Sequence, residues 1–152
     1  MAYKKVVSAE ARERIRELLK KVTDEKGGLY LAMLAQTLPE VRDRWTLIVS
    51  APWVDSSGPR TVVSYLSSCL DQYLDKNALS AIDRIVPMSK RDPFVERMFT
   101  IQPHSLVEPA RHVFNWRAGD VPIPEGYIFV VDPDAKTNGP GPQLANRRVS
   151  LR

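Results

Sequence analysis

A short polar segment, residues 55–60, carries the side chains of this sequence that are best suited to bind an anion. It lies between an apolar run, residues 45–49, and a segment with apolar residues at helical spacing, as a strand-to-helix connection would. Ligands of open α/β sheets bind at such connections, because free backbone N–H groups and the helix dipole favour negative charge. The residues that would contact a phosphorylated ligand are Ser56, Ser57, Gly58 and Arg60.

The same segment also fits an ordinary helix start without a ligand, which is the more common case. Ser57 or Gly58 would cap the helix and Pro59 would occupy its first turn, as these residue types often do. Arg60 would then be solvated. The sequence contains no GxxxxGK[ST] or GxGxxG motif, so nothing else indicates a nucleotide.

Little in the sequence supports catalysis or metal binding. His104 and His112 are the only histidines, and with eight residues and a proline between them they cannot share a helix face as metal ligands. A histidine near Glu108 or Asp92 could act as a general base, although such residues are more often surface groups. Cys69 falls on an apolar helical stripe, where a small core residue is expected. We therefore predict no catalytic residue, no metal site and no cofactor.

The positive charge of the chain lies at its two ends. Residues 1–26 hold eight Lys/Arg against five Asp/Glu, and residues 134–152 hold four against one, whereas the chain as a whole has a net charge of only +4. A nucleic-acid interface would have to use these ends. Acidic residues on the same N-terminal helix would cancel much of its field. The residues that could contact phosphates are Arg12, Arg16 and Lys20, on one outward ridge of that helix, with Arg147 and Arg148.

The segment 29–38, LYLAMLAQTL, has almost no polar side chain. Its alanines, leucines and Met33 favour a helix over a strand. A helix that is apolar on all sides must be buried or must contact a partner. Together with Trp53 and Trp116, this segment favours a protein-interaction module.

The remaining pattern predicts an α/β or α+β fold. Ser8 is expected to cap a first helix that ends at Gly27-Gly28. The segment 29–38 would be a second helix, and the two would form an N-terminal helical pair. Residues 45–87 predict a strand–helix–strand unit with parallel strands, the default for that pattern. Asp92 and Pro93 predict the start of a short helix.

The C-terminal third predicts a β section. Two β-rich segments, residues 111–116 and 126–131, are expected to pair antiparallel, with Pro124-Glu125-Gly126 as the turn before the second. From residue 134 to 152 the sequence is rich in Pro, Gly and Asn, which predicts a flexible basic tail. A single globular domain is therefore expected over residues 1–133, within the usual domain size.

The cytoplasm is the expected compartment. Cys69 is the only cysteine, so no disulfide can form within the chain. No apolar segment follows the N-terminal lysines, as a secretory signal would require. The longest mostly apolar run, residues 29–38, is too short to cross a bilayer as a helix, so no membrane interaction is predicted.

Three functions fit these features. The leading hypothesis is a small cytosolic, non-catalytic binding protein that works as a component of a protein assembly. The first alternative is a nucleic-acid-binding accessory protein that uses the basic ends. The second is an enzyme or sensor for a phosphorylated small ligand bound at residues 55–60.

Overall fold

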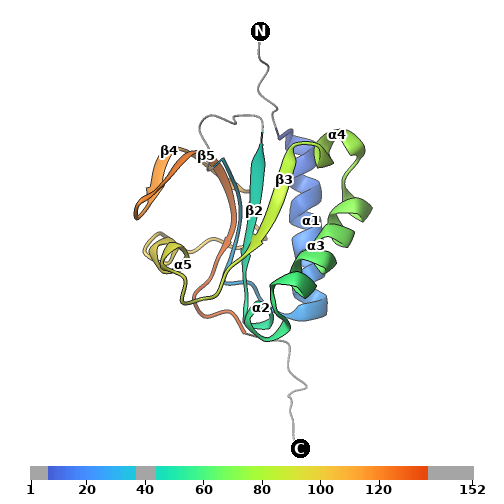
Figure 1. Ribbon diagram of the computed structural model, residues 1–152. Helices are drawn as coiled ribbons and strands as arrows, with labels where there is room; N and C mark the ends of the chain where they lie inside the picture. The colour runs from blue at the N-terminus through green and yellow to red at the C-terminus, as the bar shows by residue number, and fades with distance from the viewer. Residues whose placement is uncertain (1–6, 37–43, 137–152) are drawn as a thin grey trace, which may run out of the picture.

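The computed structural model describes residues 7–36 and 44–136 as an α+β fold with one mixed sheet. The sheet has five strands in the order β3-β2-β1-β5-β4, and only β2 and β3 are parallel (Figure 1). The elements are α1 (Ala9–Lys26), β1 (Leu31–Gln36), β2 (Trp45–Ser50), α2 (Pro52–Ser57), α3 (Pro59–Tyr73), α4 (Lys76–Leu79), β3 (Ile82–Pro87), α5 (Pro93–Met98), β4 (Arg111–Ala118) and β5 (Val121–Val131).

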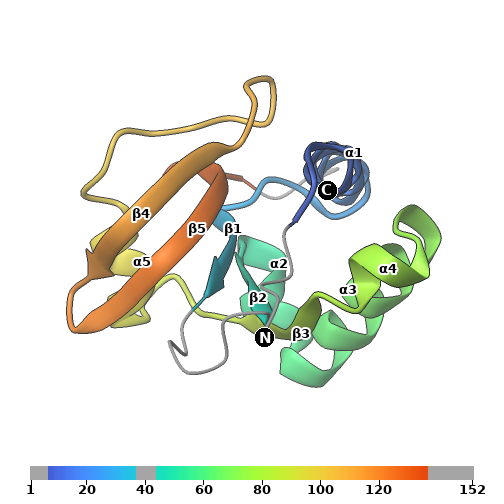
Figure 2. The same cartoon turned by 90° about the horizontal axis from the view of Figure 1, so that it is seen from above.

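Helices cover both faces of this sheet. α1 and α3 lie side by side on one face, and the short helix α5 lies on the other (Figures 1 and 2). The larger core cluster, which includes Ile15, Leu47 and Phe129, fills the space under α1 and α3. A smaller cluster around Met33 and Met98 lies on the α5 side. None of the helices that the structure describes is long and apolar enough to cross a membrane.

The first helix confirms the sequence prediction at both ends. The Ser8 Oγ accepts a hydrogen bond from the backbone N of Ala11 at 3.0 Å, which satisfies one of the unpaired N–H groups of the first turn. Gly27 ends the helix with a φ of 111°, a conformation that favours glycine. The predicted apolar stripe is buried at Ala11, Ile15, Leu18, Leu19 and Val22.

The predicted second helix over residues 29–38 is wrong, because this segment forms the central strand β1. β1 pairs antiparallel with both β2 and β5, and all six of its residues are buried. Leu34 faces the cluster under α1, whereas Met33 faces the cluster under α5. A strand covered on both faces is apolar throughout, so periodicity alone cannot distinguish it from a buried helix. Residues 37 and 38 lie outside the described part of the chain.

The predicted strand–helix–strand unit is confirmed. β2 lies inside the sheet between β1 and β3, and it pairs in parallel with β3 after the α3 crossover. The connection is more helical than expected, because α2 occupies residues 52–57 and α4 occupies residues 76–79. β3 therefore begins at Ile82, later than the sequence suggested.

The C-terminal section is the predicted antiparallel pair, with a different turn. Gly119 has a φ of 65° and lies with Asp120 between β4 and β5, whereas the expected turn at residues 124–126 lies inside β5. Gly126 pairs with Ala35 on one side and Val113 on the other. The two prolines of β5, Pro122 and Pro124, are tolerated because they precede Glu125, where the described β1–β5 pairing ends. The helix predicted at Asp92-Pro93 is confirmed as α5.

The chain beyond β5 stays attached to the end of α1. The backbone N of Gly28 donates to the carbonyl oxygen of Lys136 at 2.8 Å, and a Cβ at Gly28 would lie 3.1 Å from the Cβ of Ala135. The first residues of the predicted tail therefore pack on the domain. From residue 137 on, that tail lies outside the residues that the structure describes.

Tyr65 gives the fold a testable dependence on alkaline pH. Burial raises the pKa of Tyr65 above its ordinary value, and the hydrogen bond from its hydroxyl to Glu25 raises the pKa further. A tyrosine in the unfolded chain ionises near pH 10, whereas the folded one stays neutral. This difference in pKa stabilises the folded state by its full amount below pH ~10. The stabilisation decreases as the pH rises above that value.

We expect urea unfolding between pH ~9 and ~11 to show a smaller loss of stability for Tyr65→Phe than for the wild type. Glu25→Gln is the matched control, since it keeps a hydrogen-bond acceptor beside Tyr65 and removes the charge. Equal losses in the wild type and in Tyr65→Phe would contradict the assignment.

Candidate functional site

The predicted anion-binding residues lie where α2 meets α3, beyond the carboxyl end of β2. Ser56 and Ser57 form the end of α2, and Arg60 lies in the first turn of α3, with all three side chains exposed. Gly58 is the N-cap of α3 with a φ of 85°, and Pro59 is the first helical residue. The ordinary helix start that the sequence suggested is thus present at this junction.

Several polar groups of the junction are already engaged. The Ser56 Oγ donates to the carbonyl oxygen of Trp53 at 3.2 Å, and the backbone N of Gly58 donates to the carbonyl oxygen of Val54 at 3.3 Å. The Nε1 of Trp53 is buried and has no hydrogen-bond partner in the described part of the chain, and the same is true of the Ser50 Oγ. Neither of these atoms belongs to a residue that lines the two cavities described below.

The basic residues of α1 do not form the outward ridge that the sequence suggested. Lys20 is exposed, but Arg12 and Arg16 are half-buried. The Arg16 Nε donates to the carbonyl oxygen of Leu106 at 2.6 Å, and its Nη1 pairs with Glu13. Arg16 thus fastens the segment before β4 to α1. Arg147 and Arg148 lie outside the described residues.

Arg12 is part of an aromatic stack on the α1 side of the sheet. Its Nη1 donates to the carbonyl oxygen of Val7 at 2.6 Å and lies 3.4 Å from the Tyr127 hydroxyl oxygen. Its guanidinium carbon is 4.6 Å from the centroid of the Tyr127 ring, within the range of a cation–π contact. The Trp45 ring is 5.5 Å from the same ring, measured between centroids. Tyr127 is therefore held by groups from α1 and from β2.

His112 extends this stack toward the edge of the sheet. It is opposite Tyr127 in the β4–β5 pairing, and the two rings stack with centroids 4.2 Å apart and planes 18° apart. The His112 Nε2 is 2.7 Å from Oε2 of Glu125, a side chain that is only 10% exposed. With Glu125 ionised, its carboxylate can only accept, and Nε2 then carries the proton in this bond. The bond fixes the tautomer and the plane of the imidazole.

Phe114 is the outermost ring of the stack. Its ring centroid is 4.1 Å from that of His112, and it is opposite Glu125 in the strand pairing. The residue is 61% exposed, and with Val107 it is one of two exposed large apolar residues among those described. We call Phe114, His112, Glu125, Tyr127 and Arg12 the β4 stack. An exposed ring on such a fixed base is a feature of binding surfaces.

His104 and Cys69 are both buried within the fold. His104 is buried, its Nε2 is 2.9 Å from the carbonyl oxygen of Pro109, and its Nδ1 is 3.7 Å from Glu108. Glu108 is thus near a histidine, as the sequence suggested, with 3.7 Å between its carboxylate and the His104 ring. Cys69 is buried on the inner face of α3. Within the described residues, no group of three or more His, Cys, Asp and Glu side chains could hold a metal ion.

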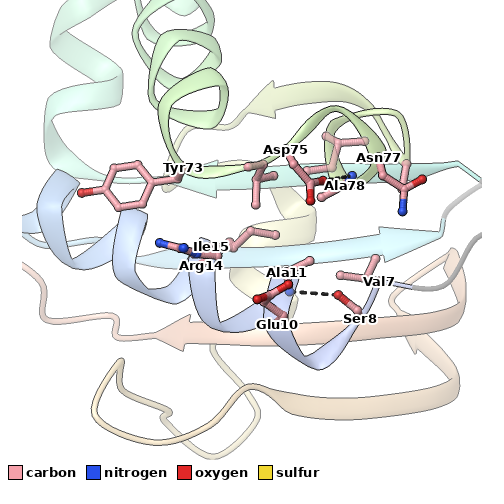
Figure 3. Close-up of a pocket in the computed structure, with 13 residues that line it drawn as sticks. Val7, Ser8, Glu10, Ala11, Arg14, Ile15, Tyr73, Asp75, Asn77 and Ala78 are labelled. Atoms are coloured by element: carbon pink, nitrogen blue, oxygen red, sulfur yellow. Dashed lines mark hydrogen bonds between the residues drawn. The ribbon is translucent and has the colours of Figure 1, made fainter.

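A cavity of about 290 Å³ lies between the first turns of α1 and the corner that joins α3 to α4 (Figure 3). Ala11, Ile15 and Leu74 are buried and line its interior. Charged side chains line its rim, with Glu10 and Arg14 on α1 and Asp75 on the opposite corner. A second cavity, of about 380 Å³, lies between α3 and the edge strand β3.

No family model, curated protein or solved structure matches this chain. The β4 stack, the α2–α3 junction and the cavities are therefore the features that can indicate a function.

The β4 stack is not apparent from the sequence, because its members are far apart in the chain. Arg12 lies 115 residues from Tyr127, and His112 lies 13 residues from Glu125. One signal was available, since His112 and Phe114 alternate along one predicted strand as Glu125 and Tyr127 do along β5. Pro124-Glu125-Gly126 was interpreted as a turn, and that interpretation removed Glu125 from the strand.

Proposed function

We propose that this chain is a small non-catalytic binding protein that works as a component of a protein assembly and contacts its partner through β4. The observation that carries the proposal is Phe114, 61% exposed on a base of stacked rings. Aromatic anchors of this kind dominate protein interfaces, and a ring that is already fixed loses little conformational entropy on binding.

The position of β4 supports the same proposal. β4 is an outer strand of the sheet, and among the described strands it pairs with β5 alone. Its eight residues contain no proline, and its one irregularity is at Asn115, which has a φ of 49° and no pair in the β4–β5 register. The other outer strand, β3, ends in Pro87 and carries the ion pair between Asp83 and Arg44, two features that discourage strand addition. An open backbone edge beside an exposed aromatic ring suits a partner that adds a strand.

The two alternative functions have less support. On α1, a nucleic-acid interface would use Arg12, Arg16 and Lys20, and the first two already bind carbonyl oxygens of this chain. A phosphate site at residues 55–60 would use Gly58, whose backbone N–H already donates to Val54. We place the protein in the cytoplasm, because its one cysteine, Cys69, is free and buried.

The proposal predicts that Phe114→Ser weakens partner binding by roughly 30-fold, corresponding to a hot-spot loss of about 2 kcal/mol. The tagged full-length chain would be used to enrich proteins from the native cell extract, with quantitation by mass spectrometry. Affinity would then be measured with the purified partner. Val107→Ser is the matched control, since Val107 is 78% exposed and lies outside β4.

A partner that Val107→Ser retains and Phe114→Ser loses would support β4 as the interface. A partner bound with equal affinity by the wild type and Phe114→Ser would contradict it.

A further inference from the structure

The outer edge of β4 has backbone groups that are free to pair with another strand. Within residues 7–36 and 44–136, the backbone of β4 is hydrogen-bonded to β5 and to no other segment. In an antiparallel pair, alternate residues direct their N–H and C=O groups away from the partner strand, so an outer strand presents unpaired donors and acceptors. β4 lies at the margin of the molecule, on the side opposite α3 (Figure 2).

The side chains of β4 give this edge a positive charge. Arg111 begins the strand, Arg117 lies near its end, and the strand contains no acidic residue. In an extended strand these two arginines are about 20 Å apart. Val113 and Phe114 lie between them, the first half-buried and the second exposed. The edge is thus apolar at its centre and basic toward both ends.

The two arginines keep most of their hydrogen-bond donors available. Arg111 Nη1 donates to the carbonyl oxygen of Gln102 at 3.3 Å, and Arg117 Nη2 donates to that of Asp120 at 3.4 Å, both at exposed positions. In the described part of the chain, neither guanidinium forms an ion pair with a carboxylate. Each fork therefore has N–H donors left for a carboxylate from outside.

The turn after β4 does not reverse this charge. Asp120 is the acidic residue of the turn, and Arg97 of α5 lies against the same turn. The Nε of Arg97 is 3.4 Å from the position that a Cβ of Gly119 would occupy. Arg97 thus offsets Asp120, and the charge of Arg117 is left without compensation at this end of the strand.

A second copy of this chain does not suit the edge. If two β4 strands paired antiparallel about Phe114, Arg111 of each copy would stand opposite Arg117 of the other. Like charges directly opposite each other destabilise a strand pair. The same charges favour a strand of opposite sign.

We propose that β4 binds an extended acidic segment of the partner protein, an inference that rests on the proposed function. The segment adds a strand to the sheet, with apolar residues opposite Val113 and Phe114 and carboxylates opposite Arg111 and Arg117. Backbone hydrogen bonds hold the segment, as in other cases of strand addition. The two charge pairs select an acidic sequence and reject a basic one.

The test is an NMR titration of the isotope-labelled full-length chain at low ionic strength. The probe is a terminally blocked peptide, Glu-Glu-Thr-Val-Thr-Val-Thr-Glu-Glu. We expect saturable shifts of the backbone amides of β4 with a Kd of about 0.1 mM. One control peptide has Lys in place of Glu, which reverses the charge. Another has Pro in place of Val, which keeps the charge but removes backbone donors. Both should bind at least about tenfold more weakly.

Three variants assign the charge selection to β4. Arg117→Glu should weaken the acidic peptide roughly tenfold and strengthen the lysine peptide, whereas Arg117→Lys keeps the charge and should retain the acidic peptide within about twofold. Arg60→Glu is the matched control, since Arg60 is exposed at the start of α3, and it should change neither peptide. Absence of shifts at about 5 mM acidic peptide, equal affinity for the acidic and lysine peptides, or a Kd that Arg117→Glu leaves unchanged would overturn the proposal.

These outcomes are distinct from failure of the proposed function. Phe114→Ser is tested with the partner from the cell extract, whatever the charge of that partner. A partner that Phe114→Ser loses and Arg117→Glu retains would overturn the acidic segment and keep β4 as the interface.

Discussion

Replacing Leu34 by alanine is expected to lower the free energy of unfolding by about 3 kcal/mol, within the usual range for a fully buried leucine. Leu34 lies in the middle of the central strand, is 0% exposed, and is paired with Leu47 on one side and Tyr127 on the other. Because β1 is hydrogen-bonded on both edges and covered on both faces, its neighbours cannot collapse into the space left behind. Equilibrium unfolding in urea measures the loss.

Leu79→Ala is the matched control for this change. Leu79 is only half-buried, at the end of the short helix α4. Leu79 packs on the margin of the larger core cluster, so its truncation should cost roughly 1 kcal/mol, clearly less than that of the fully buried Leu34. Similar losses for the two variants would mean that residue 34 is not in the interior of the sheet.

The central strand also shows what the sequence could not decide. Residues 29–38 contain good helix formers, and an isolated segment of this composition would favour a helix. Tertiary structure overrides that preference, because β2 and β5 satisfy the backbone on both edges of β1. The surrounding elements that create this environment are distant in the chain. Local composition therefore cannot supply the deciding interaction.

Local signals succeeded where a few neighbouring residues determine the structure. Ser8, Gly27 and Asp92 all act as predicted, because a cap needs only its own side chain or φ angle and the backbone next to it. The pairing of β2 with β3 was also predictable, since a helix is the usual crossover between parallel neighbouring strands. The turn between β4 and β5 was not, because two prolines near Glu125 imitate a turn.

The change of residues 29–38 from a predicted helix to the central strand also changes which residues can contact a partner. The predicted interface segment, residues 29–38, was expected to meet a partner as an apolar helix, but β1 is covered within one chain. Trp53 is likewise buried, and Trp116 is half-buried. The proposal of partner binding depends instead on Phe114, which no sequence pattern distinguishes from other residues of its strand. Its importance comes from the rings beneath it.

Glu125 orients the His112 ring of the stack. Glu125→Ala is expected to destabilise the fold by about 2 kcal/mol, as loss of a buried hydrogen bond to a charged group does. Glu125 is 8% exposed and holds the Nε2 of His112 at 2.7 Å. Without this acceptor the imidazole can rotate away from Tyr127. We expect the ring-current shifts of the His112 protons to decrease in NMR spectra, while urea unfolding reports the loss of stability.

The matched control is Glu125→Gln, which keeps an acceptor oxygen toward His112 but lacks the charge. Because hydrogen bonds to charged groups are roughly twice as strong as neutral ones, this variant should lose about half as much stability and keep the ring-current shifts. Since Phe114 contacts His112, only Glu125→Ala should also weaken the partner found with the Phe114 test. If Glu125→Ala preserved the shifts of His112, the stack would be held by ring packing alone, and the carboxylate would have no part in positioning Phe114.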